Sequence, residues 1–177
     1  LIAERLAGVG YQTAAFVSGF PLERQFGLDR GFEVYDDELP DGIERSASAT
    51  TERALSYLAR RSGERPLFLW VHYYDPHDPY SPPEPFRARF AADPYLGEIA
   101  AMDEQLGRLT KAFERLDRPS LLIVLGDHGE GRGDHGEMLH GNLLYQGVMR
   151  VPLVIAGTGV PPGGRADPVS ARQVFAT

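Results

Sequence analysis

The sequence predicts an α/β fold in which amphipathic helices cover both faces of a mainly parallel sheet. Two observations carry this prediction. Short unbroken apolar runs, typical of strands buried on both faces, alternate along the chain with stretches of helical periodicity. The chain also has 177 residues, of which 42% are hydrophobic, and this suits one domain with a sizeable core.

The first half of the chain is predicted to hold two helices and two strands. Residues 1–9 carry apolar side chains at helical spacing, and residues 13–17 form a short apolar run. Residues 18–47 are expected to be an irregular connection, which at this length usually carries function or packs over a face. A helix over 49–61 then precedes a strand over 66–74. The inner stripe of that helix is Ala54, Leu55 and Leu58.

A long amphipathic helix is predicted to begin at Pro94. Asp93 is a suitable N-cap, and proline is favoured at the first helical position. Apolar residues then recur at alternating spacings of three and four, which defines one face packed on the sheet. These residues are Ile99, Met102, Leu106, Leu109, Phe113 and Leu116.

The apolar run 121–125 is the strand around which the second half is organised, because it is bounded by Pro and Gly and has no polar residue. A Gly-rich loop at 129–141 and a short helix at 143–148 follow it. Another buried strand is predicted over 151–156, and the tail from Val169 has the pattern of a helix start.

Composition excludes some functions. A formal net charge of -7 argues against a nucleic-acid binder, although a bound divalent cation would still permit an anionic substrate. Without cysteine there is no disulfide and no thiolate zinc site. No run reaches the roughly 20 apolar residues of a membrane span. The chain starts at Leu1 in what reads as mid-helix, so we expect it to be part of a longer protein.

A carboxylate and an imidazole follow the strand 121–125 directly. Open α/β sheets place their chemistry at the carboxyl ends of their strands, and Asp127 and His128 occupy that position. Carboxylate oxygen suits hard divalent cations, and imidazole is accepted by zinc and manganese. The flanking glycines would permit the sharp turn that lets both side chains bind one ion. The alternative is a helix-capping Asp127 beside an exposed His128.

Two further histidines are candidates for the same rim. His77 lies in a proline-stiffened loop and is a candidate general acid or donor to an anionic oxygen; the alternative is a surface histidine in a turn. His140 could face the same anion. The carboxylate–imidazole pair at 134–135 either orients ligands or structures its loop. We expect Asp127, His128, His77 and His140 to converge.

The ordered set of motifs resembles the sulfatase family of the alkaline-phosphatase superfamily, and its opening segments look like the bacterial branch. Each motif alone is a weak signal, but together they run over nearly the whole chain. They lie at residues 10–19, 27–32, 71–80, 126–130, 133–136, 139–141 and 145–152.

The resemblance implies an α/β/α sandwich that hydrolyses sulfate or phosphate esters, of small molecules or glycans, at a divalent metal. Calcium is the metal of sulfatases, and Mn²⁺ or Zn²⁺ also fit the pair here. By this likeness Asp127 and His128 are metal ligands. His77 and His140 are catalytic residues that contact the substrate. The compartment stays open between an exported or periplasmic and a cytoplasmic location in a bacterium.

The chain departs from the family in one decisive respect. The family nucleophile is a formylglycine made from Cys or Ser in a Cys/Ser-x-Pro-x-Arg motif, and no such motif occurs here. The resemblance therefore implies that residues 1–177 are a single sulfatase-like domain, incomplete at both ends and inactive by itself. The nucleophile and the paired aspartates of the family belong before Leu1. Apolar surface left uncovered would allow self-association.

Three functions stay open. The first is a sulfuric ester hydrolase. The second, favoured by an Asp–His rather than an Asp–Asn pair, is a phosphodiesterase, phosphonate monoester hydrolase or phosphoethanolamine transferase of the same superfamily. The third is a non-catalytic domain that binds anions or a partner.

Overall fold

The computed structural model describes residues 1–40, 42–116 and 118–176. The chain forms two compact units, Leu1–Arg115 and Leu116–Thr177, and each is described by itself. The single domain expected over 1–177 stays a prediction. In the described part of the chain, no helix has the length and apolar character needed to span a bilayer.

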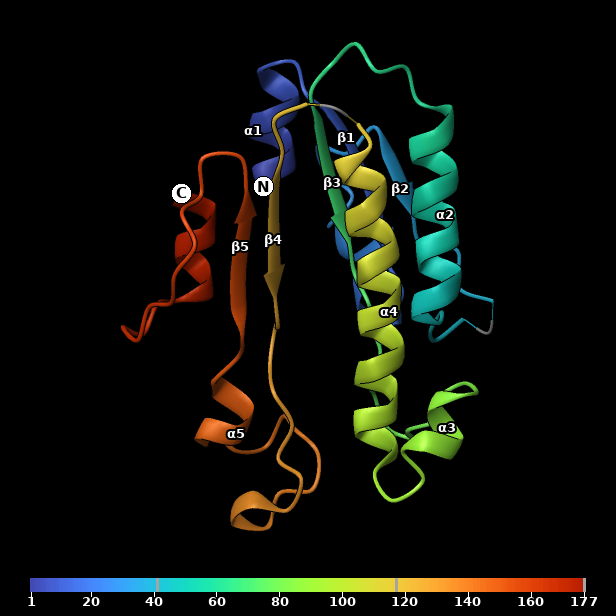
Figure 1. Ribbon diagram of the computed structural model, residues 1–177, viewed down its shortest axis with the longest axis vertical. Helices are drawn as coiled ribbons and strands as arrows, with labels where there is room; N and C mark the ends of the chain where they lie inside the picture. The colour runs from blue at the N-terminus through green and yellow to red at the C-terminus, as the bar shows by residue number, and fades with distance from the viewer. Residues whose placement is uncertain (41, 117, 177) are drawn as a thin grey trace. The chain divides into compact units, whose positions relative to one another are not determined.

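The first unit contains a three-stranded parallel sheet in the order β2-β1-β3 (Figure 1). β1 (Gln12–Phe16) and β3 (Leu67–Val71) lie where strands were predicted. β2 (Val34–Asp36) lies inside the connection expected to be irregular. Three residues are too few to show a hydrophobic period, so this strand exists through its pairing with β1. The predicted parallel sheet is confirmed.

Two long helices dominate the first unit, α2 (Ala47–Arg60) and α4 (Pro94–Glu114). Each begins at a side-chain cap: Ser46 accepts a hydrogen bond from the Ala49 amide, and Asp93 accepts one from the Leu96 amide. The shorter helical elements are α1 (Ile2–Gly8), α3 (Phe86–Arg89), η1 (Phe20–Leu22) and η2 (Arg24–Phe26).

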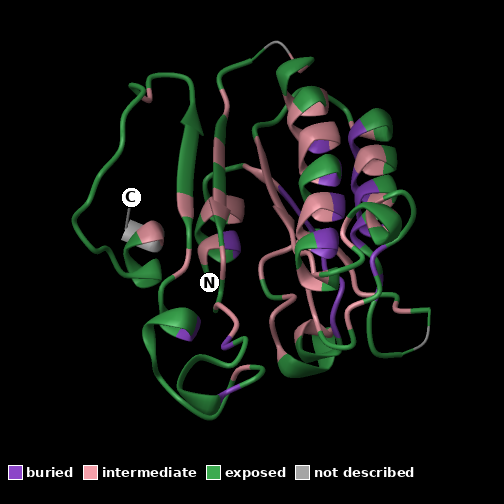
Figure 2. Ribbon diagram, turned by 60° about the horizontal axis from the view of Figure 1, so that its bottom comes forward, coloured by how far each residue is buried: buried purple, intermediate pink, exposed green. Residues whose placement is uncertain are grey.

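The core of the first unit lies between one face of the sheet and the helices α2 and α4. Ala14 and Phe16 of β1 pack with Ala54 and Leu109, and Figure 2 shows buried residues along these same elements. The stripe predicted on α4 is confirmed at Leu109, which is buried, and at Phe113, which packs against the core. Toward the start of the helix, the fully buried face lies one position earlier than predicted and includes polar side chains. That face is Gly97, Glu98, Ala101, Gln105 and Leu109.

A buried arginine holds the connection between β1 and α2. Arg45 bonds the Asp36 carboxylate at 2.5 Å, the Val17 carbonyl at 2.7 Å and the Thr50 hydroxyl at 3.1 Å. Its side chain is 1% exposed, so a charge in this position needs all of these partners. The connection is therefore ordered by contacts between residues far apart in sequence.

The second unit contains β4 (Leu121–Leu125) and β5 (Leu153–Gly157), which pair antiparallel with Leu121 opposite Gly157 (Figure 1). The bounds of β4 agree with the sequence, but its predicted burial on both faces is wrong. Exposed and half-buried residues alternate along it, and Leu121 is 55% exposed. A sheet of two strands has too few residues to bury such a run.

The long loop between β4 and β5 folds back on itself. Residues 131–133 donate amide hydrogen bonds to the carbonyls of 137–139 at 2.8–3.0 Å, around η3 (Asp134–Gly136). α5 (Gln146–Met149) follows, close to the helix predicted over 143–148. The tail forms the 3₁₀ segment η4 (Ala171–Ala176).

Candidate functional site

The carboxyl end of the three-stranded sheet is tied together by a buried hydroxyl. Ser18 follows β1, and its Oγ donates to the carbonyl of His72 at 2.7 Å and accepts from the amide of Tyr74 at 2.7 Å. The chain after β3 is thereby fixed to the chain after β1. This is the edge at which open α/β sheets place ligands.

His77 lies in the loop that leaves this edge. Its Nδ1 lies 2.7 Å from the carbonyl oxygen of Asp78, and because a carbonyl only accepts, Nδ1 carries the proton. Its Nε2 lies 3.1 Å from the Tyr74 hydroxyl, and the two rings stack with centroids 4.2 Å apart. His77 is therefore half-buried and held by neighbours, which argues against a loosely placed surface histidine.

Two carboxylates, the half-buried Asp75 and the buried Glu98, anchor the loop to the helices. Asp75 accepts the amide of Ala47, the first residue of α2, at 2.6 Å. Glu98 of α4 accepts the amides of His77 at 3.1 Å and Ser81 at 2.5 Å. Burial raises the pKa of both carboxyls, against the effect of these hydrogen bonds.

Asp127 and His128 follow β4 as a matched pair of potential ligands. His128 Nδ1 lies 2.9 Å from the carbonyl of Gly129, so it carries the ring proton when the imidazole is neutral. His128 Nε2 then has a lone pair, and it lies 3.8 Å from Asp127 Oδ2. Both side chains are exposed. This spacing allows the oxygen and the nitrogen to bind one ion.

His140 lies directly beside this pair. The ring centroids of His128 and His140 are 4.0 Å apart. The Nδ1 of His140 lies 3.1 Å from Oε1 of Glu130, whose side chain is only 4% exposed. The carboxylate therefore fixes the orientation of the His140 ring.

Glycines allow the loop to reach this arrangement. A Cβ on Gly129 would lie 2.1 Å from the carbonyl oxygen of Gly147, and one on Gly131 would lie 2.4 Å from that of Glu137. Gly129 also donates its amide to the Val148 carbonyl at 2.7 Å. Side chains at either position would force these backbone segments apart.

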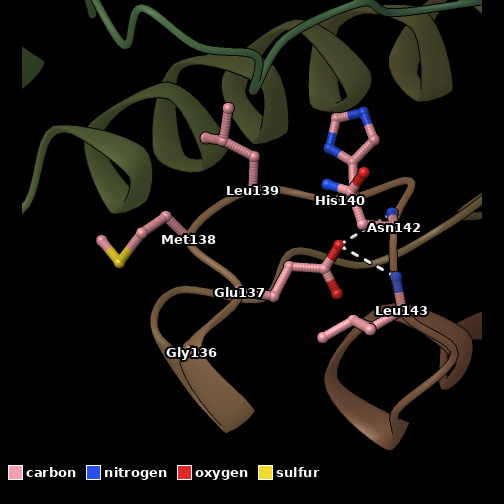
Figure 3. A pocket seen from close by; sticks show the side chains of 7 residues that line it. All are labelled: Gly136, Glu137, Met138, Leu139, His140, Asn142 and Leu143. Carbon is pink, nitrogen blue, oxygen red and sulfur yellow. Dashed lines mark hydrogen bonds between the residues drawn. The ribbon is translucent and has the colours of Figure 1, made fainter.

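A pocket of about 430 Å³ borders His140 (Figure 3). One oxygen of the buried Glu137 accepts the amides of Asn142 at 2.9 Å and Leu143 at 3.2 Å, which closes the turn that carries His140. Figure 3 shows the side chains of Leu139 and His140 on the same side of the loop backbone, pointing away from Glu137. The volume suits a small organic group.

The donor set near Asp127 fits a divalent cation only in part. Carboxylate oxygen and imidazole nitrogen suit Mn²⁺ or Zn²⁺ better than Ca²⁺, which prefers oxygen alone. Among the described residues, no group of three or more His, Cys, Asp or Glu side chains forms a metal cage. Asp127 Oδ2 and His128 Nε2 would supply two ligands to such a site.

The structure brings three of the four predicted site residues together. Asp127, His128 and His140 lie in one loop of the second unit, while His77 belongs to the first unit, and its convergence with them stays a prediction. The pair at 134–135 is joined at 2.9 Å, and His135 stacks on Tyr145 with centroids 3.7 Å apart, which favours a role in structuring the loop.

Sequence reasoning missed the two carboxylates that hold the histidines. Glu130 lies within the motif at residues 126–130, but no role was predicted for it. Glu98 lies one position before the predicted apolar stripe of α4. A polar residue at helical spacing with Ala101, Gln105 and Leu109 was the available signal for Glu98.

A family model described as Sulfatase matches residues 2–177. The choline-sulfatase of Rhizobium meliloti is 35% identical over 85 residues, which are 47% of this chain and 16% of that protein.

Two solved structures share the fold at 20% identity. One is Ps i-CgsB in complex with k-i-k-neocarrahexaose, with a TM-score of 0.72 over 98% of this chain and 51% of that one. The other is the phosphonate monoester hydrolase of Agrobacterium radiobacter, with a TM-score of 0.64 over 86% and 51%.

These likenesses confirm the alkaline-phosphatase-like α/β fold, and the chain spans about half or less of the length of these relatives. Members of the matched family are hydrolases that generally use a divalent metal. Because the Sulfatase family model covers all but the first residue, the chain belongs to the sulfatase family.

Proposed function

We propose that this chain supplies part of the active site of a metal-dependent sulfuric ester hydrolase. Asp127 and His128 serve as metal ligands, and His77 and His140 contact the sulfate and take part in catalysis. The chain has no Cys/Ser-x-Pro-x-Arg motif, and covalent catalysis requires its nucleophile. We therefore expect no turnover from these 177 residues by themselves.

The observation that carries the proposal is the contact between His128 and His140 beside Asp127. The two rings lie 4.0 Å apart, and Asp127 Oδ2 lies 3.8 Å from His128 Nε2. A cation bound by Asp127 and His128 would supply Lewis acidity toward an ester oxygen. His140 would then lie next to the anion that this cation attracts.

The histidines have separate tasks in this proposal. His140, whose Nδ1 bonds Glu130, donates a hydrogen bond from Nε2 to a nonbridging oxygen when the ring is protonated on both nitrogens, and negative charge grows on that oxygen in the transition state. His77 keeps its Nδ1 proton on the Asp78 carbonyl, so its Nε2 is the atom that exchanges a proton with the leaving oxygen. The pocket beside His140 accommodates the alcohol part of the ester.

A second candidate function is hydrolysis of phosphate diesters or phosphonate monoesters. The imidazole of His128 favours it, because an Asp–His pair is a better match for Mn²⁺ or Zn²⁺ than for Ca²⁺. The fold likeness to a phosphonate monoester hydrolase agrees with this candidate. Both candidates use the same four residues and differ in nucleophile and metal.

The test is an assay of the complete gene product against 4-nitrophenyl sulfate, bis(4-nitrophenyl) phosphate and a phenylphosphonate monoester. Each substrate is tried after chelation and after return of Ca²⁺, Mn²⁺ or Zn²⁺. Sulfate release that depends on the metal supports the first candidate. A threonine nucleophile, or turnover of the phosphorus esters alone, supports the second. Metal-replete protein that cleaves none of the three contradicts both.

A further inference from the structure

We propose that Glu98 is a positioning residue for His77, acting through the backbone of the loop that carries it. This inference rests on the catalytic role proposed for His77. Glu98 lies in the second turn of α4, and His77 lies on the loop after β3, so the two meet only in the folded chain. One carboxylate oxygen takes the amide of His77 and the other takes the amide of Ser81.

The composition of the loop explains why these amides need a partner. Residues 75–85 contain five prolines, none of which has an N–H to donate. The loop therefore cannot build a regular ladder, and its remaining amides need acceptors from elsewhere in the chain. Glu98 bonds two of them, four residues apart, and so fixes both ends of the segment that contains the His77 ring.

The loop also packs directly on the same turn of α4. A Cβ on Gly97 would lie 2.8 Å from Cγ of Pro82 and 3.3 Å from Cβ of Phe90. Pro82 is itself buried. The loop is thus held to α4 by close packing at one residue and by two hydrogen bonds at the next.

Stability alone is a poor reason for this carboxylate. Glu98 is 6% exposed on the buried face of α4, where an apolar side chain would bury its surface without cost. Burial raises its pKa, and the negative charges of Asp75 and Glu44 add to the effect. An ionised group in this place lowers the stability of the folded chain. Its two hydrogen bonds to the loop therefore point to a positioning role.

The remaining freedom of His77 is removed by other contacts. Its ring stacks on Tyr74 and its Nδ1 bonds the Asp78 carbonyl. These contacts orient the ring, while Glu98 sets the position of the backbone from which the ring projects. Displacement of that backbone would move Nε2 away from the leaving oxygen, and misplacement by about 1 Å can cost roughly a hundredfold in rate.

The first test uses the 177-residue chain and needs no activity. Amide hydrogen exchange is measured by NMR for Glu98→Ala, Glu98→Gln and the control Glu104→Gln, an exposed carboxylate on the same helix. We expect the amides of His77 and Ser81 to exchange at least about tenfold faster in Glu98→Ala. Glu98→Gln keeps one strong acceptor and should lose protection at one of the two. Unchanged exchange at both amides in either folded variant overturns the proposal.

The second test uses the complete gene product and a double-mutant cycle. Glu98→Gln should lower kcat by roughly ten- to hundredfold with little change in KM, and His77→Ala should lower it by roughly 10²–10⁴. If Glu98 acts through His77, adding Glu98→Gln to His77→Ala causes no further loss. Losses that multiply overturn the proposal. A fast His77→Ala enzyme contradicts the role given to His77, whereas the exchange result still tests the link between Glu98 and the loop.

Discussion

The imidazole rings of His128 and His140 lie 4.0 Å apart at the end of β4, although twelve residues separate them in sequence. Three features of the loop produce this contact: the turn after Asp127, the close backbone approach at Gly129 and the hydrogen bond between Glu130 and His140. Each can be changed separately, which leads to the following predictions.

Asp127→Ala is expected to weaken metal binding strongly, because it removes the carboxylate that lies 3.8 Å from the Nε2 of His128. Binding of Mn²⁺ to the 177-residue chain, followed by electron paramagnetic resonance, should weaken at least about tenfold. Asp167→Asn, a change to an exposed aspartate of the second unit outside this loop, is the control and should bind as the unaltered chain does. Equal Mn²⁺ affinity in the Asp127 variant and the control would contradict the assignment.

Removal of the Glu130 carboxylate is expected to release the His140 ring. In Glu130→Ala the Nδ1 proton loses its acceptor, so the neutral ring should populate both tautomers, which ¹H–¹⁵N correlation spectra distinguish. Glu130→Gln retains an oxygen that can accept the same proton and should keep the Nδ1 tautomer. A Glu130→Ala spectrum identical to that of the unaltered chain would show that another contact orients the ring.

Gly129→Ala is expected to destabilise the second unit. The added Cβ would lie 2.1 Å from the carbonyl oxygen of Gly147, and a backbone atom cannot move aside as a flexible side chain can. We expect the free energy of unfolding, measured by urea denaturation, to fall by about 1–3 kcal/mol. In the control Gly163→Ala the added Cβ enters open space, and the free energy of unfolding should change by less than about 0.5 kcal/mol. Equal changes in Gly129→Ala and Gly163→Ala would contradict the close backbone approach at Gly129.

Asp75→Asn is expected to stabilise the first unit at neutral pH. Burial raises the pKa of Asp75, against the hydrogen bond from the Ala47 amide. The folded state therefore holds this proton more tightly than the unfolded state. The contribution of Asp75 to stability is full below its unfolded pKa and is lost as pH rises through the higher folded value.

Asparagine keeps the acceptor for the Ala47 amide and cannot ionise. The free energy of unfolding is measured at several pH values between about 3 and 7. Its value for Asp75→Asn, relative to that of the unaltered chain, should increase as pH rises. Asp78→Asn, at an exposed position in the same loop, should show no such trend. If the free energy of unfolding of Asp75→Asn instead fell relative to the unaltered chain as pH rises, the folded state would favour the ionised Asp75 carboxylate.

Local chemistry accounts for the elements that the sequence predicted well. Asp93 followed by Pro94 marks the start of α4, because the cap and the missing proline donor are both properties of adjacent residues. The apolar run 121–125 matches β4 at both ends for the same reason. The ordered motifs around Asp127, His77 and His140 also identified the family, since each is a short contiguous pattern.

Contacts between distant residues decided the rest. β2 forms because Val34 lies beside Ala14, and Arg45 is buried because Asp36 and Val17 come to meet it. Neither contact produces a periodic pattern of apolar residues in the sequence.

The sequence by itself thus determined the longer helices and strands and the histidines and aspartate that can carry chemistry. Only the tertiary structure revealed that Glu98 holds the backbone of His77 and that Glu130 holds the ring of His140. A glutamate is the same letter in the sequence whether its carboxylate lies in water or is buried against two amides. Its role depends on the partners that folding brings to it.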